Sequence, residues 1–138
     1  MSKLFVDTSG WGNLIDVSQP YHALATDWYR NTKQQPAGLI TSNYVLAELV
    51  ALLESPLRIP RVQAIAFLKS LKDSPAVEVL HIDSDLDLTA WKLLEARPDK
   101  AWSLVDCSSF AIMQQQNISH ALTSDRHFEQ AGFIRLLK

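Results

Sequence analysis

The sequence contains a single cysteine, Cys107, and no long uncharged apolar run among its 138 residues. One cysteine cannot form an internal disulfide bond, and no charged-then-apolar signal segment opens the chain. We therefore expect a cytoplasmic protein in a reducing environment, with no membrane span. The chain also lacks an internal repeat, a low-complexity tract and an interdomain linker. With 47% apolar residues, residues 1–138 are expected to form one domain with an ordinary core.

A surplus of positive charge is absent as well. The 13 basic and 15 acidic residues give a formal net charge of −2. This balance argues against a protein that coats nucleic acid indiscriminately, but it allows a local basic rim around an acidic pocket. A zinc pattern is also missing, because the four histidines show no metal-ligand spacing and only one cysteine is present. We therefore expect any polyanion to be bound at a local site, and we expect no zinc there.

Five short β-prone runs alternate with helical patterns along the chain. The runs occupy residues 3–6, 38–41, 77–82, 120–123 and 133–137. Strands that alternate with helices imply right-handed crossover connections. We therefore predict an α/β fold, in which a mainly parallel central sheet of about five strands is flanked by helices on both faces.

Prolines and capping signals mark where helices begin and end. Pro20 and Pro60 each suit the first position of a helix, where a backbone N–H has no helical partner. Ser84 is followed three residues later by Asp87, a spacing that resembles a capping box and predicts a helix start at Ser84. The helix after the second strand must end before Pro56, because a residue that precedes proline disfavours the helical conformation.

Four acidic residues stand where carboxylates are unusual, at the ends of apolar runs or on an apolar helical stripe: Asp7, Glu48, Asp106 and Asp125. In parallel sheets, ligands bind outside the carboxyl ends of the strands. Asp7 and Asp125 follow strands, Glu48 lies about one and a half turns into its helix, and Asp106 lies in the first turn of its own. All four can therefore meet at one edge of the sheet. Acids brought together repel one another unless a cation such as Mg²⁺ or Mn²⁺ binds them, so the pattern indicates metal-assisted phosphodiester chemistry.

Each acid also has a structural alternative. Asp7 could close a strand in a turn, and Glu48 could reach solvent from the margin of its stripe or pair with a basic residue. Asp106 could complete a capping box with Ser103, and Asp125 could cap a short helix. Capping and metal binding are compatible, so these alternatives do not remove the acids from a site.

Polar and aromatic residues next to the acids extend the candidate site. The hydroxyl groups of Thr8 and Ser9 could orient Asp7 or hold metal-bound water. Trp11 and Trp102 lie close in sequence to site acids and could stack on bases, although packing in the core is the favoured use.

Four motifs follow one another along the chain. They are Asp7-Thr8-Ser9, Glu48 within NYVLAEL, residues 102–110 (WSLVDCSSF), and residues 123–128 (TSDRHF) leading to residues 131–133 (AGF). This ordered set resembles the PIN domain family, and in particular the small single-domain toxins of VapBC-type toxin–antitoxin systems. The resemblance extends from near residue 3 to near residue 137.

The resemblance implies a metal-dependent endoribonuclease that cleaves single-stranded or loop RNA and uses Mg²⁺ or Mn²⁺. The positions that match the family's four acids are Asp7, Glu48, Asp106 and Asp125. Thr123 matches its recurrent hydroxyl position, and Thr8 or Ser9 supplies the hydroxyl after the first acid. No acid is missing, so we expect an active enzyme. The resemblance also implies a homodimer and inhibition by a small antitoxin protein.

The expected roles follow from the ligand types. The three aspartates would coordinate the metal directly or through water, whereas Glu48 would bind metal or act as the base that orients the attacking water. One ion and two ions are both compatible with four carboxylates. Substrate phosphates need nearby cations, and the nearest in sequence are Lys100 and Arg126.

Other functions fit the sequence less well. A phosphatase with a phospho-aspartate intermediate would need a second acid at position 9, where Ser9 stands. A receiver-type phosphoacceptor domain would need an acidic pair before the accepting aspartate and a lysine after a late strand, and neither is evident. A non-catalytic RNA-binding or scaffold module of the same fold is the main alternative, and it predicts RNA binding without cleavage.

Overall fold

A computed structural model describes residues 3–138, and its centre is a five-stranded sheet in which every strand runs parallel to its neighbours. The strand order is β3-β2-β1-β4-β5. The strands are β1 (Leu4–Val6), β2 (Leu39–Ser42), β3 (Val77–Leu80), β4 (His120–Leu122) and β5 (Ile134–Arg135). Each strand overlaps its predicted run, which confirms the predicted α/β class and sheet.

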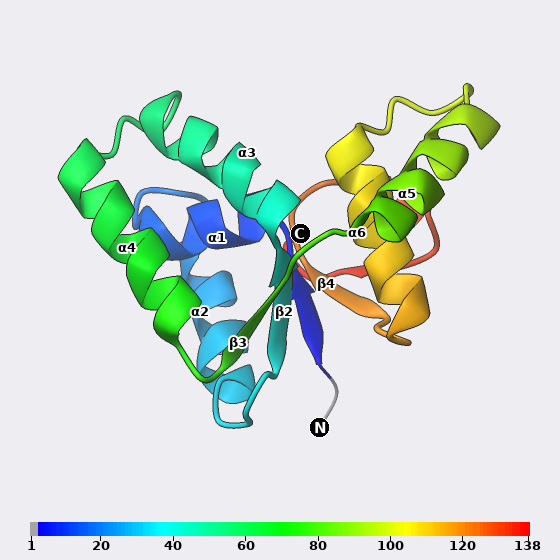
Figure 1. The fold of residues 1–138 in the computed structure, drawn as a ribbon. Helices are drawn as coiled ribbons and strands as arrows, with labels where there is room; N and C mark the ends of the chain where they lie inside the picture. Colours follow the sequence, from blue (N-terminus) through cyan, green and yellow to red (C-terminus); the bar gives the residue numbers. More distant parts are fainter. Residues whose placement is uncertain (1–2) are drawn as a thin grey trace.

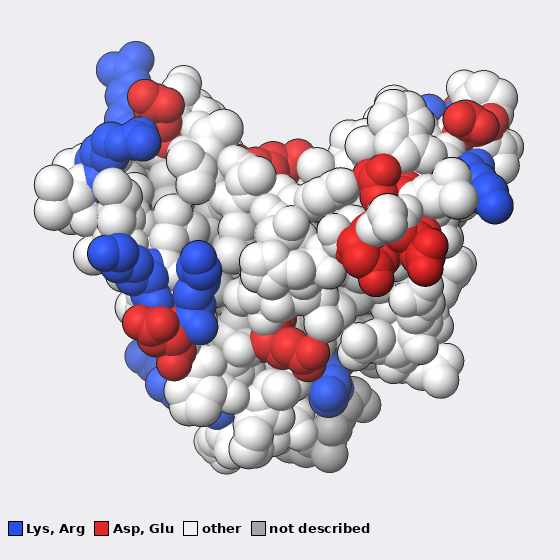
Figure 2. Space-filling view, viewed as in Figure 1, with Lys and Arg blue, Asp and Glu red and all other residues white. Residues whose placement is uncertain are grey.

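Helices cover both faces of this sheet. They are α1 (Thr8–Ile15), α2 (His22–Thr32), α3 (Asn43–Glu54), α4 (Arg61–Asp73), α5 (Ser84–Ala96), α6 (Leu104–Gln115) and α7 (His127–Gln130). Figure 1 shows α1 to α4 on one side of the sheet and α5 and α6 on the other, and the space-filling view in Figure 2 shows a notch in the surface between these two groups. Within residues 3–138, no helix combines the length and the apolar character that a membrane crossing requires.

Three buried phenylalanine rings fasten α6 and α7 to the sheet. Phe5 of β1 stacks on Phe128 of α7 with ring centroids 6.4 Å apart, and Phe110 of α6 meets Phe128 edge-on at 5.0 Å. All three side chains are completely buried, and edge-to-face pairs of this kind add to the free energy gained by burial. The helices that carry the C-terminal motifs are thus held firmly against the first strand.

The strand order reverses between β1 and β4. From β1 the chain continues to β2 and β3 on one side, whereas β4 and β5 extend the sheet on the other side. The register pairs Val6 with Leu122, so the segments after them leave the sheet together. Ligands of parallel sheets bind at such a reversal, outside the carboxyl ends of the strands.

Helix α1 is the one element in the described part of the chain that the sequence patterns did not predict. It begins directly after β1 and contains two glycines, which weaken the helical signal. Gly10 permits an unusually close contact, because a Cβ atom at this position would lie 2.1 Å from the carbonyl oxygen of Leu122. The glycine therefore lets α1 pack directly on the end of β4, beside the point of strand reversal.

Two predicted helix starts are wrong by one or two residues, whereas the predicted start at Ser84 is confirmed. Pro20 precedes the first helical residue of α2 by two positions, and Pro60 occupies the N-cap of α4 rather than its first turn. The cap of α5 is Asp83, whose carboxylate accepts a hydrogen bond from the Leu86 N–H at 2.9 Å. Ser84 is therefore the first residue inside α5, because the acid before it already satisfies the free N–H group.

Candidate functional site

The four predicted acids meet at the point of strand reversal. Asp7 follows β1 and Asp125 lies in the segment after β4, while Glu48 comes from the second turn of α3 and Asp106 from the first turn of α6. In Figure 2, acidic side chains lie at the base of the notch between the two groups of helices. The structure thus places at one sheet edge the acids that lie far apart in the sequence.

Two overlapping groups of residues define the site. Asp7, Glu48 and Asp125 line one open pocket of about 370 Å³ together with Thr8 and Ser9. Asp106, Asp125 and His127 each present one ligand atom, and these atoms all lie within 4.8 Å of one another. Asp125 belongs to both groups, so the four carboxylates form one continuous acidic site.

On the β1 side of the site, Asp7 and Glu48 each have one carboxylate oxygen fixed by a threonine hydroxyl. The Thr123 hydroxyl donates to Asp7 Oδ2 at 3.0 Å, and the Thr8 hydroxyl donates to Glu48 Oε1. Asp7 stands at the N-cap of α1, yet its side chain accepts no capping hydrogen bond. Its Oδ1 atom is buried and has no partner among the described residues, although buried polar atoms are normally paired.

Asp106 and Asp125 show the same division between a bonded and a free oxygen. Asp106 Oδ2 accepts a hydrogen bond from the Ser103 N–H at 3.0 Å, and Asp125 Oδ1 accepts one from the His127 N–H at 2.9 Å. Ser103 and Asp106 complete the predicted capping box. For each of the four acids, the second oxygen accepts no hydrogen bond from residues 3–138, so it is free to bind a ligand.

The electrostatics of Asp7 also favour a bound cation when its carboxyl group is ionised. Burial raises the pKa of Asp7 from 3.8 to about 7, and the negative charges of Asp106 and Glu48 add to the increase. The backbone dipole of Thr8 and the hydroxyl of Thr123 lower the pKa but do not offset these effects. Only 4% of Asp7 is exposed. A carboxylate so placed is stabilised in its charged form by a bound cation.

The donor set fits a hard divalent cation. The free atoms are carboxylate oxygens from four acids, which are the ligands that Mg²⁺ and Mn²⁺ prefer. The unpaired buried oxygen of Asp7 belongs to a carboxyl group within the electrostatic influence of Asp106 and Glu48. The residues therefore fit the predicted metal, with Asp7 as the ligand that most needs it.

Hydroxyl groups tie the two strand ends together. Ser9 Oγ and Thr123 Oγ1 are 3.1 Å apart, and the Ser124 N–H donates to Ser9 Oγ at 3.0 Å. The Asp125 N–H donates to Thr123 Oγ1, also at 3.0 Å. Of the two predicted uses of the hydroxyls after the first acid, direct orientation of Asp7 is not seen, because Thr8 bonds Glu48 and Ser9 bonds the segment after β4; the holding of metal-bound water stays a prediction.

The two predicted substrate cations lie in different places. Arg126 lines an open pocket beside Asp125, whereas Lys100 lies in the connection between α5 and α6 with its Nζ atom 3.9 Å from Asp99. Arg135 of β5 lines the same pocket as Arg126 and donates to the Ser124 carbonyl oxygen at 3.0 Å. No sequence pattern marked Arg135, because only the pairing of β4 with β5 brings this residue near the site.

His127 is a further residue that sequence patterns missed. Its Nδ1 atom lies 2.8 Å from Asp106 Oδ2 and 3.4 Å from Asp125 Oδ1. A pattern of paired histidines does not include His127, because the partners of His127 are carboxylates and Asp106 is 21 residues away. Its position two residues after a site acid was the only available signal.

Trp11 and Trp102, which are close in sequence to the site acids, pack in the core, and this is the use that the sequence analysis favours over base stacking. Trp11 is 1% exposed and donates its indole N–H to the Thr41 hydroxyl at 3.2 Å. Trp102 is 6% exposed and packs edge-on against Phe110, with ring centroids 5.1 Å apart. Neither ring is open to a base.

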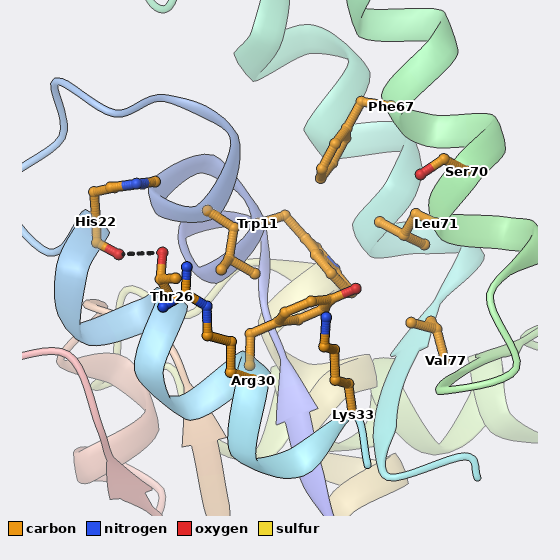
Figure 3. A pocket seen from close by; sticks show the side chains of 11 residues that line it. Trp11, His22, Thr26, Arg30, Lys33, Phe67, Ser70, Leu71 and Val77 are labelled. Carbon is orange, nitrogen blue, oxygen red and sulfur yellow. Dashed lines mark hydrogen bonds between the residues drawn. The ribbon is translucent and has the colours of Figure 1, made fainter. Parts of the chain in front are cut away.

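A second pocket, shown in Figure 3, lies between α2 and α4 and has a different chemistry. Arg30 and Lys33 project from α2 toward it, and Trp11 and Phe67 contribute aromatic walls. None of its lining residues is an aspartate or a glutamate. The pocket therefore offers no carboxylate ligand for a metal, whereas the acids that could hold a divalent cation lie at the notch.

Comparisons with known proteins match nearly the whole chain. A family model described as PIN domain matches residues 4–134. The chain is 34% identical over 133 residues to the 23S rRNA-specific endonuclease VapC20 of Mycobacterium tuberculosis, and the match covers 96% of this chain and 97% of that protein. The crystal structure of Mycobacterium tuberculosis VapC20, a sarcin-ricin loop cleaving toxin, matches with a TM-score of 0.86 and 32% identity, over 99% of this chain and 100% of that one.

More distant structures share the fold. FitAcB from Neisseria gonorrhoeae and DNA-bound VapBC from Salmonella typhimurium each match with a TM-score of 0.68, at 15% and 17% identity respectively. Each match covers 98% of this chain and 96% of the other chain. Similarity at this level establishes a common architecture.

Proposed function

The chain belongs to the PIN domain family, and on that premise we propose that it is a metal-dependent endoribonuclease and the toxin of a toxin–antitoxin pair. The main support for the proposal is that the two carboxylate oxygens of each of the four acids differ in their hydrogen bonding. Each has one oxygen held by a hydrogen bond and one oxygen that accepts none from residues 3–138. A scaffold protein has no need of such a set, since unpaired clustered carboxylates destabilise the fold.

Each acid has a role in this proposal. The free oxygens of Asp7, Asp106 and Asp125 would hold Mg²⁺ or Mn²⁺, directly or through water. When bound, such an ion activates water and neutralises the charge that develops on the phosphate. Glu48, fixed by Thr8 through one oxygen, would use the other to bind metal or to accept a proton from the attacking water. The water oxygen joins phosphorus as the bond to the 3′-oxygen breaks, which leaves a 5′-phosphate and a 3′-hydroxyl.

The proposed substrate is a loop of ribosomal RNA. Support comes from the similarity to a 23S rRNA-specific endonuclease over almost the full length of both chains. The site is open and its rim carries Arg126 and Arg135 beside Asp125, so the sugar-phosphate backbone of a splayed loop could be held where the acids act. This arrangement fits a chain with a net charge of −2, which must concentrate its cations locally.

A metal-dependence assay tests the enzymatic part. Purified protein, freed of any partner, is expected to cut 23S rRNA in the presence of Mg²⁺ or Mn²⁺. EDTA should stop cleavage, because it removes the cation that the free oxygens hold, and an excess of Mg²⁺ should restore it. Fragments would be mapped by primer extension, and their ends checked for 5′-phosphate. If the protein binds the RNA but never cuts it with either ion, the scaffold alternative is correct.

The proposed role as a toxin involves an inhibitory protein partner. The solved relatives VapBC and FitAcB support a small antitoxin, and we propose that the chain forms a homodimer in the cytoplasm. Expression of the chain alone is expected to arrest growth through loss of rRNA, whereas Asp106→Asn expressed at the same level should not. Co-expression of the small protein that co-purifies with the chain should relieve the arrest. Normal growth with active wild-type enzyme would contradict the toxin role.

A further inference from the structure

We propose that His127 is a positioning residue of the metal site: its Nδ1–H group links Asp106 and Asp125 and keeps one oxygen of each directed to a shared cation. The inference rests on the proposed metal-dependent function, and it assigns a role to a side chain outside the four acids. His127 comes from α7, whereas Asp106 comes from α6, so the link joins two separate elements.

The geometry gives the direction of the hydrogen bond. Nδ1 of His127 lies 2.8 Å from Asp106 Oδ2, a distance that requires a shared proton. An ionised carboxylate offers only lone pairs, so the proton is on the imidazole and Nδ1 donates. The same nitrogen lies 3.4 Å from Asp125 Oδ1. Of the side chains that the structure describes, His127 alone contacts both of these acids.

The protein leaves these two acids otherwise weakly restrained. Apart from His127, Asp106 Oδ2 is held by the Ser103 N–H, and Asp125 Oδ1 accepts its only other bond from the His127 backbone N–H. Two carboxylates so close repel each other before a cation binds. A donor between them reduces that repulsion and preserves their free oxygens, as partners of metal-binding carboxylates do elsewhere.

The imidazole itself is well supported. Phe128, the next residue, is fully buried against Phe110 with ring centroids 5.0 Å apart. Gln130 of the same helix accepts a hydrogen bond from the Trp102 indole at 3.0 Å. Helix α7 is therefore anchored just after His127, to α6 through Phe110 and to the segment before α6 through Trp102, which restrains the position of the ring between the acids.

Mn²⁺ affinity, measured by calorimetry or electron paramagnetic resonance without RNA, tests the role. His127→Ala is expected to weaken Mn²⁺ binding about 10- to 100-fold. In His127→Asn the side-chain nitrogen can occupy the place of Nδ1, so affinity should return to within a few fold of wild type. In His127→Gln the amide reaches instead toward the place of Nε2, and the loss should persist. His120→Ala is the matched control, because His120 lies at the opposite end of β4 and should bind Mn²⁺ normally.

A metal-free measurement provides an independent check. A long-range ¹H–¹⁵N spectrum of the folded wild type should show His127 with its proton on Nδ1, whereas a bare Nδ1 would overturn the inference. Wild-type affinity in His127→Ala would also overturn it while leaving the proposed function intact. If His127→Asn is as weak as His127→Ala, the ring nitrogen itself is the ligand and the positioning role is wrong. A wild-type protein that binds no Mn²⁺ would overturn both the inference and the proposed metal dependence.

Discussion

Asp7→Asn and Asp106→Asn are each expected to reduce RNA cleavage by about 10³-fold or more while the protein stays folded. Asparagine keeps the size of aspartate but removes its charge. At position 7 the amide oxygen can still accept the Thr123 hydroxyl bond, and this choice places the amide NH₂ where Oδ1 now lies. A donor group at the one buried oxygen without a partner repels a cation, so both metal binding and cleavage should fail.

The control for these variants is Asp99→Asn. It makes the same chemical change at a side chain that is 58% exposed and pairs with Arg97 at 3.0 Å, away from the site. Initial cleavage rates at saturating Mg²⁺ should stay within about twofold of wild type, because an exposed pair of this kind contributes little. Circular dichroism would show that all three variants fold. A folded Asp106→Asn protein that cuts RNA at the wild-type rate would refute the site.

The second large effect concerns the stability of the metal-free protein as pH changes. The pKa of Asp7 is 3.8 in an unfolded chain and about 7 in the folded one, so between these values the folded state holds a proton that the unfolded state has lost. Asp7 therefore contributes its full stability below about pH 4, and this contribution is lost as the pH rises through about 7. The difference between the two pKa values corresponds to about 4 kcal/mol.

Asp7→Asn isolates this contribution from other titrating groups. The free energy of unfolding in urea would be measured for both proteins with EDTA from pH 4 to pH 8. The wild type should lose stability relative to the variant as pH rises, by up to about 4 kcal/mol. Saturating Mg²⁺ should reverse the trend in wild type, because the ion competes with the proton at Asp7, and it should stabilise the variant much less. Parallel curves for the two proteins would show that Asp7 is ionised without metal.

Sequence patterns predicted the architecture because each strand lies within a short β-prone run between helical patterns. The first two strands are completely buried, and parallel strands of this kind are read from continuous apolar runs. Helix α1 escaped prediction because Gly10 and Gly12 weaken its pattern, and the reason for Gly10 is a contact with β4. Such a requirement arises only once the strands are assembled.

The site likewise has some features that can be read from the local sequence and others that arise only when the chain is folded. The four acids could be recognised because each occupies a strand end, a helix start or an apolar stripe. The capping box that orients Asp106 was predicted, but the bonds that orient Glu48 and Asp7 could not be, because their donors lie 40 and 116 residues away. Thr8 and Thr123 were assigned to the site, but their bonds to Glu48 and Asp7 become visible only in the folded structure. His127 and Arg135 came near the acids only through the packing of α7 and β5.

The central claim is that the oxygens left free by the protein bind one or more divalent cations. A crystal structure of the protein grown with Mn²⁺ tests it most directly, because the ion is identified by its anomalous scattering. We predict an ion at about 2.0–2.5 Å from Asp7 Oδ1, the range of hard divalent cations with carboxylate oxygens, with the free oxygens of Asp106 and Asp125 in or next to its coordination shell. Anomalous density that is absent from this site, while the protein still cleaves RNA with Mn²⁺, would contradict the account.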